Sequence, residues 1–408
     1  MRPILVAGLD IGSTKTCAVI VEVNREAEGT GLRVLGIGQT RTGGVRREVV
    51  TDIEETTESV RKALHEAELM AGVKPDRVYV GIAGDHIDAR ISTGVVAVGG
   101  GEIGPSDVDR VHEVARAVVV PSDREVLHVM PQEYTVDEQK GIRDPVGMAG
   151  TRLEAEVYII TSGSPATRNL RKAVSRAGYT VDGFVHEPVA TSRAVLTEDE
   201  RELGVALVDL GGGTTELVVF HEGKMRHLSS IPWGGSNVTN DVMKGLTISF
   251  AEAERAKVQW GVASTQLADP RETVELPGPG PGTKHQVPRE MLAHIIEQRM
   301  DEILGLVAQD LEQLEESGEI GAGVVLTGGG AEITGAVDVA QRVFSHHVRV
   351  GVPGESLGGL VDAVRKPKFA TAVGLALHGA EQDQEVVQSV RLGQGALGRI
   401  LDWLREFF

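Results

Sequence analysis

Two short segments combine an aspartate, several glycines and hydroxyl side chains in the order that a phosphate-binding turn requires. The first, Ile4 to Val23, reads as an apolar strand, a turn and a second strand, and the turn contains Asp10, Gly12, Ser13, Thr14 and Lys15. The pattern returns from Val205 to Phe220, and there the turn contains Asp209, Gly211, Gly212, Gly213 and Thr214. Glycine lets backbone N–H groups approach phosphate oxygens, hydroxyls add donors and lysine adds a positive charge. We therefore predict two similar domains whose phosphate-binding hairpins face each other.

A third glycine turn and the two aspartates extend this prediction. The turn that follows the apolar strand at 324–327 consists of Gly328, Gly329 and Gly330. One such turn would indicate only a tight bend, but three make coincidence a poor explanation. Asp10 and Asp209 end equivalent strands, so we expect both to face one Mg²⁺, through waters rather than directly, because Mg²⁺ dehydrates reluctantly. The chain has neither a P-loop motif nor a Rossmann glycine motif after its first strand, which excludes both of those nucleotide-binding classes.

The composition is that of an acidic globular protein. The chain has 408 residues, 41% of them apolar, and this length suffices for two or three domains with substantial cores. Its net charge is −18. Nucleic acid needs clustered Lys and Arg, and only 3% of the residues are aromatic, so we expect no nucleic-acid partner. The single cysteine, Cys17, predicts a buried thiol in a reducing compartment. The apolar run Pro3–Leu9 is too short for a secretory signal.

Hydrophobic periodicity predicts further elements between and after the two hairpins. We expect a helix over Thr51–Met70 and then a small inserted α+β subdomain from about Asp85 to Ile160. Its elements are a helix from the N-cap Ser106 to about Val120 and strands at Glu125–Met130 and Leu153–Thr161. In the second half we expect an exposed loop or hairpin over Ser264–Glu290 and a long helix over about Pro288–Glu316.

The last fifteen residues, Gln394–Phe408, predict an amphipathic helix. Its apolar side and flank carry Leu397, Ile400, Leu401, Trp403, Leu404, Phe407 and Phe408. Such a helix is about 22 Å long and charged along one face, so it cannot span a bilayer. It either packs on the protein's own core or lies in a membrane surface. We favour the membrane, because the polar, glycine-containing stretch 381–393 before it is typical of a tether.

The three glycine turns together resemble those of the actin/Hsp70/sugar-kinase superfamily, whose nucleotide lies in a cleft between two RNase H-like domains. Within it, the chain closely resembles the FtsA family of bacterial cell-division proteins over nearly its whole length. The segments that carry this resemblance are Gly81–His86, Val129–Tyr134, Ile142–Met148, Arg152–Glu154, Thr197–Gly204 and Ile231–Asp241.

The resemblance implies an actin-like α/β fold that binds ATP and Mg²⁺. It implies that the turn Gly328–Gly330 lies against the sugar and α-phosphate and that Glu254 and Lys257 flank the adenosine. Glu187 takes the place of the residue that positions the attacking water, so any hydrolysis should be slow. Glu254 and Lys257 are also spaced for a simple ion pair on one helix. In the second hairpin Glu216 stands where the family usually has aspartate, which affects any hydrolysis rate.

The resemblance also implies how the chain is divided. The first actin-like domain comprises 1–84, 161–196 and about 365–380, the inserted subdomain 1C comprises 85–160, and the second domain comprises 197–364 with 242–320 as its outer subdomain. Residues 381–393 are the tether and 394–408 the membrane-targeting helix.

The leading functional hypothesis is an ATP-binding, filament-forming adaptor at the cytoplasmic face of the inner membrane. The resemblance implies that it anchors filaments of the tubulin-like protein FtsZ at the division site and recruits later division proteins. It places the FtsZ C-terminal peptide beside Arg299 and Glu302, which are also spaced for a local ion pair. Subdomain 1C would contact further copies of the chain. The alternatives are a pilus-assembly ATPase of the same superfamily and a sugar-kinase-type enzyme.

Overall fold

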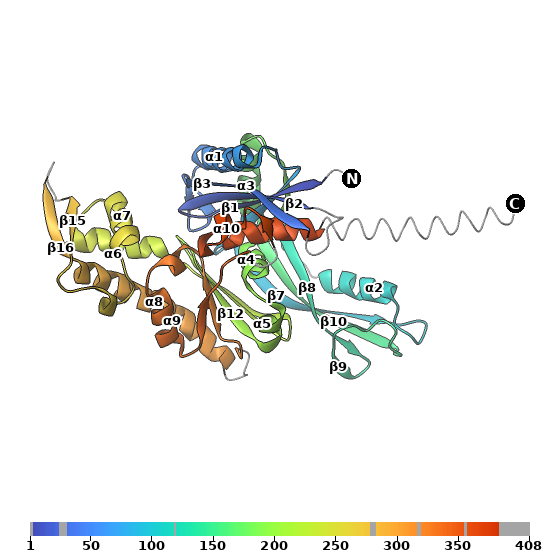
Figure 1. Cartoon of the computed structure of the whole chain (residues 1–408). Helices are drawn as coiled ribbons and strands as arrows, with labels where there is room; N and C mark the ends of the chain where they lie inside the picture. The colour runs from blue at the N-terminus through green and yellow to red at the C-terminus, as the bar shows by residue number, and fades with distance from the viewer. Residues whose placement is uncertain are drawn as a thin grey trace.

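Figure 1 shows the computed structural model of the chain. It describes residues 3–23, 31–117, 120–277, 283–315, 320–354 and 357–382. The predicted amphipathic helix 394–408 and all but the first two residues of the predicted tether 381–393 lie outside these ranges. Within them, no helix has the length and apolar character needed to cross a membrane.

The first sheet has the strand order β11-β6-β1-β2-β3-β19. Its strands are β1 (Ile4–Ile11), β2 (Lys15–Val23), β3 (Leu32–Arg41), β6 (Arg77–Ile82), β11 (Val181–His186) and β19 (Gly358–Gly359). β1, β2 and β3 form an antiparallel meander, whereas β6 and β11 continue the sheet in parallel with β1. A small hairpin of β4 (Val45–Arg46) and β5 (Val49–Val50) follows β3.

Helices cover both faces of this sheet. On one face α1 (Ile53–Ala71) and α3 (Ser164–Arg176) pack on Ala7 and Leu9 of β1, and on the other the helix at 370–382 packs on Val6. The alternation is that of a strand buried on both faces. α1 confirms the predicted helix at 51–70: Asp52 caps its start, and it ends at Gly72, whose φ of 71° suits glycine.

The second sheet repeats this topology. Its order is β14-β13-β12-β17-β18, with three antiparallel strands followed by two parallel ones, as in the series β3-β2-β1-β6-β11. The strands are β12 (Val205–Leu210), β13 (Thr215–His221), β14 (Lys224–Ile231), β17 (Val324–Thr327) and β18 (Val348–Val350). The duplication predicted from the two hairpins is therefore present in the sheets themselves.

The outer face of the second sheet is covered by helices that share one core with it. They are α6 (Gly235–Leu246), α7 (Phe250–Trp260), α8 (Arg289–Glu315) and α9 (Ala336–Phe344). α8 confirms the predicted long helix, and β15 (Thr273–Pro277) with β16 (Lys284–Pro288) forms a hairpin within the segment predicted as loop or hairpin. The short helices are α4 (Glu187–Val195), α5 (Glu198–Leu203) and α10 (Val361–Val364).

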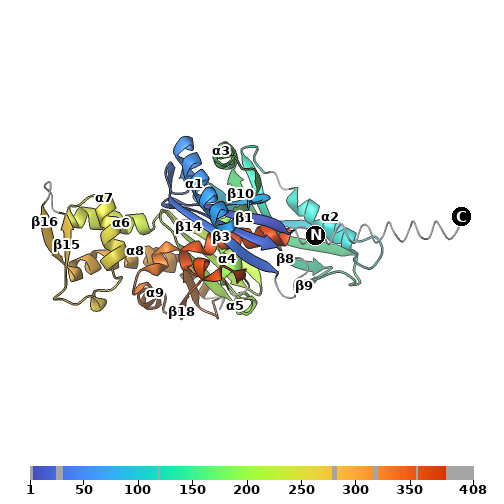
Figure 2. The same ribbon diagram turned by 45° about the horizontal axis from the view of Figure 1, so that its top comes forward.

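The segment between β6 and α3 forms a separate α+β subdomain. Its sheet has the order β7-β10-β8-β9, and α2 packs on one face. The elements are β7 (Ile87–Ala97), α2 (Pro105–Arg116), β8 (Arg124–Val136), β9 (Gln139–Ile142) and β10 (Arg152–Gly163). In Figures 1 and 2 this subdomain and the hairpin β15–β16 lie at opposite ends of the molecule.

The start of α2 corrects the prediction that Ser106 is its N-cap. The N-cap is Gly104, and Pro105 is the first helical residue, a position where the missing N–H of proline costs nothing. Asp107 accepts a hydrogen bond from the Gly104 N–H at 2.9 Å. The helix also ends at Arg116 rather than near Val120.

The helix at 370–382 approaches β1 so closely that only glycine fits between them. A Cβ atom on Gly8 would lie 2.1 Å from the carbonyl oxygen of Ala372 and 2.6 Å from the nitrogen of Ala376. At its other end the helix is tied to α4 by an ion pair between Glu381 and Arg193. This packing fixes the position of the residues at 367–371 next to the ends of both central strands.

We expect Gly8→Ala to destabilise the protein by about 1–3 kcal/mol, because the added methyl forces two backbones apart. Gly305→Ala is the matched control: this glycine lies in α8 with no atom within 4 Å of an added Cβ, so alanine should stabilise by up to about 1 kcal/mol. Urea unfolding midpoints measure both. Equal midpoints for the two variants would contradict the close contact.

Candidate functional site

The turns that follow β1 and β12 meet face to face. A Cβ atom on Gly212 would lie 2.3 Å from Oγ1 of Thr14, and one on Gly213 would lie 2.4 Å from Oγ of Ser13. Glycine in the second turn is therefore what allows the hydroxyls of the first turn to approach its backbone. The structure brings together the two turns that the sequence singled out.

The third glycine turn joins them at Asp209. Gly328 has a φ of 83°, and a Cβ atom there would lie 2.2 Å from Oδ1 of Asp209. A Cβ atom on Gly330 would lie 2.7 Å from the Cβ of Leu210, whereas Gly329 has no atom within 4 Å of such a position. The backbone at Gly329 is thus the unobstructed part of this turn.

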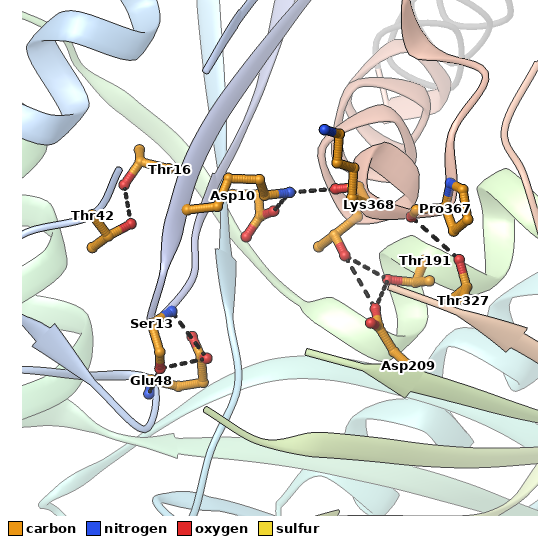
Figure 3. Close-up of polar contacts among 12 residues, drawn as sticks. Asp10, Ser13, Thr16, Thr42, Glu48, Thr191, Asp209, Thr327, Pro367 and Lys368 are labelled. Carbon is orange, nitrogen blue, oxygen red and sulfur yellow. Dashed lines mark hydrogen bonds and ion pairs between the residues drawn. The ribbon is translucent and has the colours of Figure 1, made fainter. Parts of the chain in front are cut away.

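Asp209 is held by two threonines that the sequence did not single out. Thr191 of α4 and Thr371 of the helix 370–382 donate to its Oδ2 at 3.4 and 3.3 Å, and their hydroxyls lie 3.0 Å apart (Figure 3). Both partners are far from Asp209 in the chain and have no local motif, so no sequence signal could have identified them. One carboxylate thereby connects three separate elements.

Lys15 is engaged within the protein rather than free. Its Nζ lies 2.9 Å from Oδ2 of Asp10 and donates to the backbone carbonyl of Lys368 (Figure 3). Burial by itself lowers the pKa of Lys15, but the facing Asp10 carboxylate outweighs it and the pKa is raised. Cys17, on the same strand, is buried as predicted.

Several acidic groups share this cleft, and their pKa values are raised. Burial, together with its acidic neighbours, raises the pKa of Glu216 to about 8, although Ser230 donates to it at 2.8 Å. Burial and the Asp10 charge raise the pKa of Asp209 to about 6. In the described part of the chain no three His, Cys, Asp or Glu side chains converge as direct metal ligands. Burial and like charge instead favour the protonated forms of Glu216 and Asp209.

Glu187 starts α4, directly after the last residue of β11. A Cβ atom on Gly81 of β6 would lie 2.8 Å from its Oε1, so glycine at this position leaves room for the carboxyl group. Burial, then the charges of Glu48 and Asp10, raise the pKa of Glu187 well above its ordinary value. The structure thus places it with the other acids of the cleft.

Glu254 and Lys257 lie on α7, beside the start of α6. Lys257 pairs with Glu254 at 2.8 Å, and its Nζ also donates to the Gly235 carbonyl at 3.1 Å. Gly235 in turn donates its N–H to the carbonyl of Gly211 at 2.9 Å. The ion pair considered from the sequence is present, but Lys257 is buried and connects to the second turn rather than facing solvent.

Arg299 and Glu302 belong to a different group of contacts, on α8. Arg299 pairs with Glu302 at 2.7 Å and with Asp241 of α6 at 2.5 Å, and its guanidinium lies 4.5 Å from the ring centre of Trp233. The local ion pair that the spacing allowed is present.

Known proteins resemble this chain in both sequence and fold. A cell division protein FtsA from Pseudomonas aeruginosa is 42% identical over 93% of this chain and 90% of its own length. The corresponding protein of Neisseria meningitidis is 41% identical over 98% of both chains. Family models match at 206–374, for cell division protein FtsA, and at 84–161, for the SHS2 domain inserted in FtsA.

Solved structures with low sequence identity share the fold. A PilM–PilN type IV pilus biogenesis complex matches 92% of this chain and 98% of its own, with a TM-score of 0.65 and 16% identity. MreB 5 of Spiroplasma citri bound to AMPPNP matches 95% and 99%, with a TM-score of 0.56 and 13% identity. The fold is therefore actin-like, with an inserted SHS2 domain, and the chain belongs to the FtsA family of cell division proteins.

Proposed function

We propose that the three turns form a Mg²⁺–ATP site. The observation that carries this proposal is the meeting of two duplicated glycine turns beside a surplus of acidic groups. Glycine backbones and the hydroxyls of Ser13 and Thr14 supply donors for phosphate oxygens, and clustered carboxylates favour a divalent cation. MreB 5, whose structure has the same fold, is bound to AMPPNP, which supports a nucleotide as the ligand.

In this proposal each group of residues contacts a different part of Mg²⁺–ATP. Asp10 and Asp209 hold Mg²⁺ through its waters, and bound Mg²⁺ neutralises phosphate charge. The phosphates lie between the turns at 12–15 and 211–214, and the unobstructed backbone of Gly329 suits the sugar side. Lys257 and Glu254 flank the adenosine. Glu187, whose pKa is raised by burial and by the acidic groups around it, would position the attacking water, which suits slow hydrolysis.

We further propose that the protein is an adaptor that ties FtsZ filaments to the cytoplasmic face of the inner membrane. Membership of the FtsA family supports a role in division, and the apolar side of 394–408 supports the membrane contact. The 42% identity to an FtsA protein favours this function over a pilus ATPase, whose complex shares the fold at 16% identity, and over a sugar-kinase-type enzyme.

The inserted subdomain supplies the surface that we assign to contacts between copies of the chain. β7 is an edge strand of its sheet, and it exposes Ile91 and Val95, which are 57% and 42% accessible. They lie four residues apart on a strand and so share one face. Apolar side chains on a sheet edge favour association with another chain.

Membrane binding should depend on the terminal apolar side chains. A protein with Leu401 and Trp403 both replaced by glutamate should stay in the supernatant when vesicles of bacterial lipid are sedimented, whereas the wild type pellets. Each large side chain buried in lipid contributes about 1.5–3 kcal/mol, and a filament multiplies the contacts. Glu406→Gln on the polar face is the control and should pellet. ATP binding should be equal in all three proteins; sedimentation of the double variant would contradict the anchor.

FtsZ-peptide affinity should change in opposite directions at Arg299 and Glu302. An acidic tail needs the Arg299 guanidinium, so Arg299→Ala should weaken binding of a synthetic FtsZ C-terminal peptide. Because Glu302 already occupies one side of that guanidinium, Glu302→Ala should tighten binding. Arg255→Ala removes a similar surface pair with Glu252 on α7 and should leave affinity unchanged. Fluorescence anisotropy measures all three, and weaker binding by Glu302→Ala would refute the arrangement.

The acidic cleft should make stability depend on pH when cation and nucleotide are absent. The Glu216 carboxyl keeps its proton up to about pH 8 in the folded protein but only to about 4.5 when unfolded. The folded state therefore binds more protons in this window, and stability falls as pH rises. Glu216→Gln should melt like the wild type near pH 5 and a few degrees higher at pH 8.5. Glu290→Gln, on the surface of α8, should show no such divergence.

A further inference from the structure

The turn of the hairpin β4–β5 has an unusual backbone. Arg46 pairs with Val49, so the turn consists of Arg47 and Glu48 alone, and both have positive φ values, 47° and 61°. Two-residue turns of this kind are normally built from glycine and asparagine, and a charged side chain in the left-handed region is strained. Such strain persists where surrounding contacts maintain it, often at functional sites.

The tip of this hairpin contacts both phosphate turns and the loop after β6. A Cβ atom on Gly213 would lie 3.3 Å from the Cα of Arg47, and one on Gly84 would lie 3.1 Å from the Cβ of Glu48. The tip therefore touches the second turn on one side and the loop after β6 on the other. This position directs Glu48 toward the first turn.

Glu48 occupies the hydrogen-bond donors of Ser13. Its Oε1 accepts from the Ser13 hydroxyl at 2.9 Å and from the Ser13 backbone N–H at 3.3 Å (Figure 3). The Glu48 N–H also donates to Ser13 Oγ at 3.1 Å. A backbone N–H and a hydroxyl that converge on one oxygen are the donors that a phosphate would use in this turn.

The surroundings of Glu48 are unfavourable to its charge. Burial and the Asp10 carboxylate raise its pKa to about 7, while the bonds from Ser13 act in the opposite direction. Among the described residues Glu48 forms no ion pair with a basic side chain. The contact with Ser13 is thus the interaction that favours an ionised carboxyl group here, and another anion could replace it.

We propose that Glu48 is an internal substitute for a nucleotide phosphate: its carboxyl group holds the Ser13 donors in the empty protein and is displaced when ATP binds. The inference rests on the proposed ATP site and adds to it a residue that sets nucleotide affinity. Since both anions need the same donors, every binding event must first break the contact between Glu48 and Ser13. The apparent affinity for ATP is reduced by that cost.

Titrating the protein with fluorescent ATP in the presence of Mg²⁺, and separately with fluorescent adenosine, tests this proposal. Glu48→Ala should bind ATP about tenfold more tightly than the wild type, because it frees two donors and removes one negative charge. Adenosine affinity should not change. Glu48→Gln, which keeps an acceptor but loses the charge, should fall between them. Tighter adenosine binding, or ATP binding that is unchanged or weaker in Glu48→Ala, would overturn the proposal.

Glu222→Ala is the matched control. Glu222 is also a glutamate with positive φ, 54°, at a hairpin tip, but it lies between β13 and β14 and pairs with Arg226. Glu222→Ala changes the net charge and the local backbone strain as Glu48→Ala does, but it frees no donor of Ser13. ATP affinity should therefore stay at the wild-type value. Melting curves of all variants confirm that they are folded.

Two further measurements separate this inference from the ATP site itself. Asp209→Ala should weaken ATP binding; if neither it nor the wild type binds ATP, the proposed site fails. If the wild type binds ATP and Asp209→Ala weakens that binding, but Glu48→Ala does not tighten it, then the proposal that Glu48 takes the place of a phosphate fails. Hydrogen exchange adds a direct readout: in Glu48→Ala the Ser13 amide should exchange faster than in the wild type, because it loses its bond to Glu48 Oε1, and ATP should slow it again. If ATP leaves that rate unchanged, the phosphate does not take this donor.

Discussion

The contact between the helix at 370–382 and β1 is the constraint on which the rest of the site depends. Because Gly8 has no side chain, the helix lies directly on the strand that ends at Asp10. Its first turn then brings Thr371 to Asp209, and the segment before it brings the Lys368 carbonyl to Lys15. A single pair of close-packed backbones thus connects both halves of the duplicated fold at their carboxylates, and a larger residue at position 8 would separate them.

The concentration of acidic groups follows from that geometry. Two equivalent strands that end at one point bring their aspartates together, and Glu187 and Glu216 are added from elements next to them. Lys15 pairs with Asp10, and burial raises the pKa values of Asp209 and Glu216, which favours their protonated forms. The net charge of −18 over the whole chain therefore does not describe this site, where several acidic groups are buried together.

Features that depend on local pattern were predictable from the sequence. The repeated Asp and glycine spacing predicted both hairpins, and their strand order and facing turns agree with it, while helical periodicity located α1 and α8. Glu48 and Thr371 could not be found this way, because their partners lie 35 and 162 residues away and neither residue has a motif. The start of α2 was misjudged because serine was preferred as a cap over the Gly104-Pro105 pair. The roles of the site residues toward ATP, and of 394–408 toward lipid, remain predictions.

The ion pair between Glu381 and Arg193 gives the helix at 370–382 a second role. From Thr371 to Glu381 an α-helix extends about 15 Å, and its hydrogen-bonded backbone is stiff over that length. At one end of the helix Thr371 is hydrogen-bonded to Asp209, and at the other Glu381 pairs with Arg193 of α4. The last 26 residues of the chain follow Gln382. The helix therefore holds the glycine turns and Glu381, the first residue of the predicted tether, at a fixed separation.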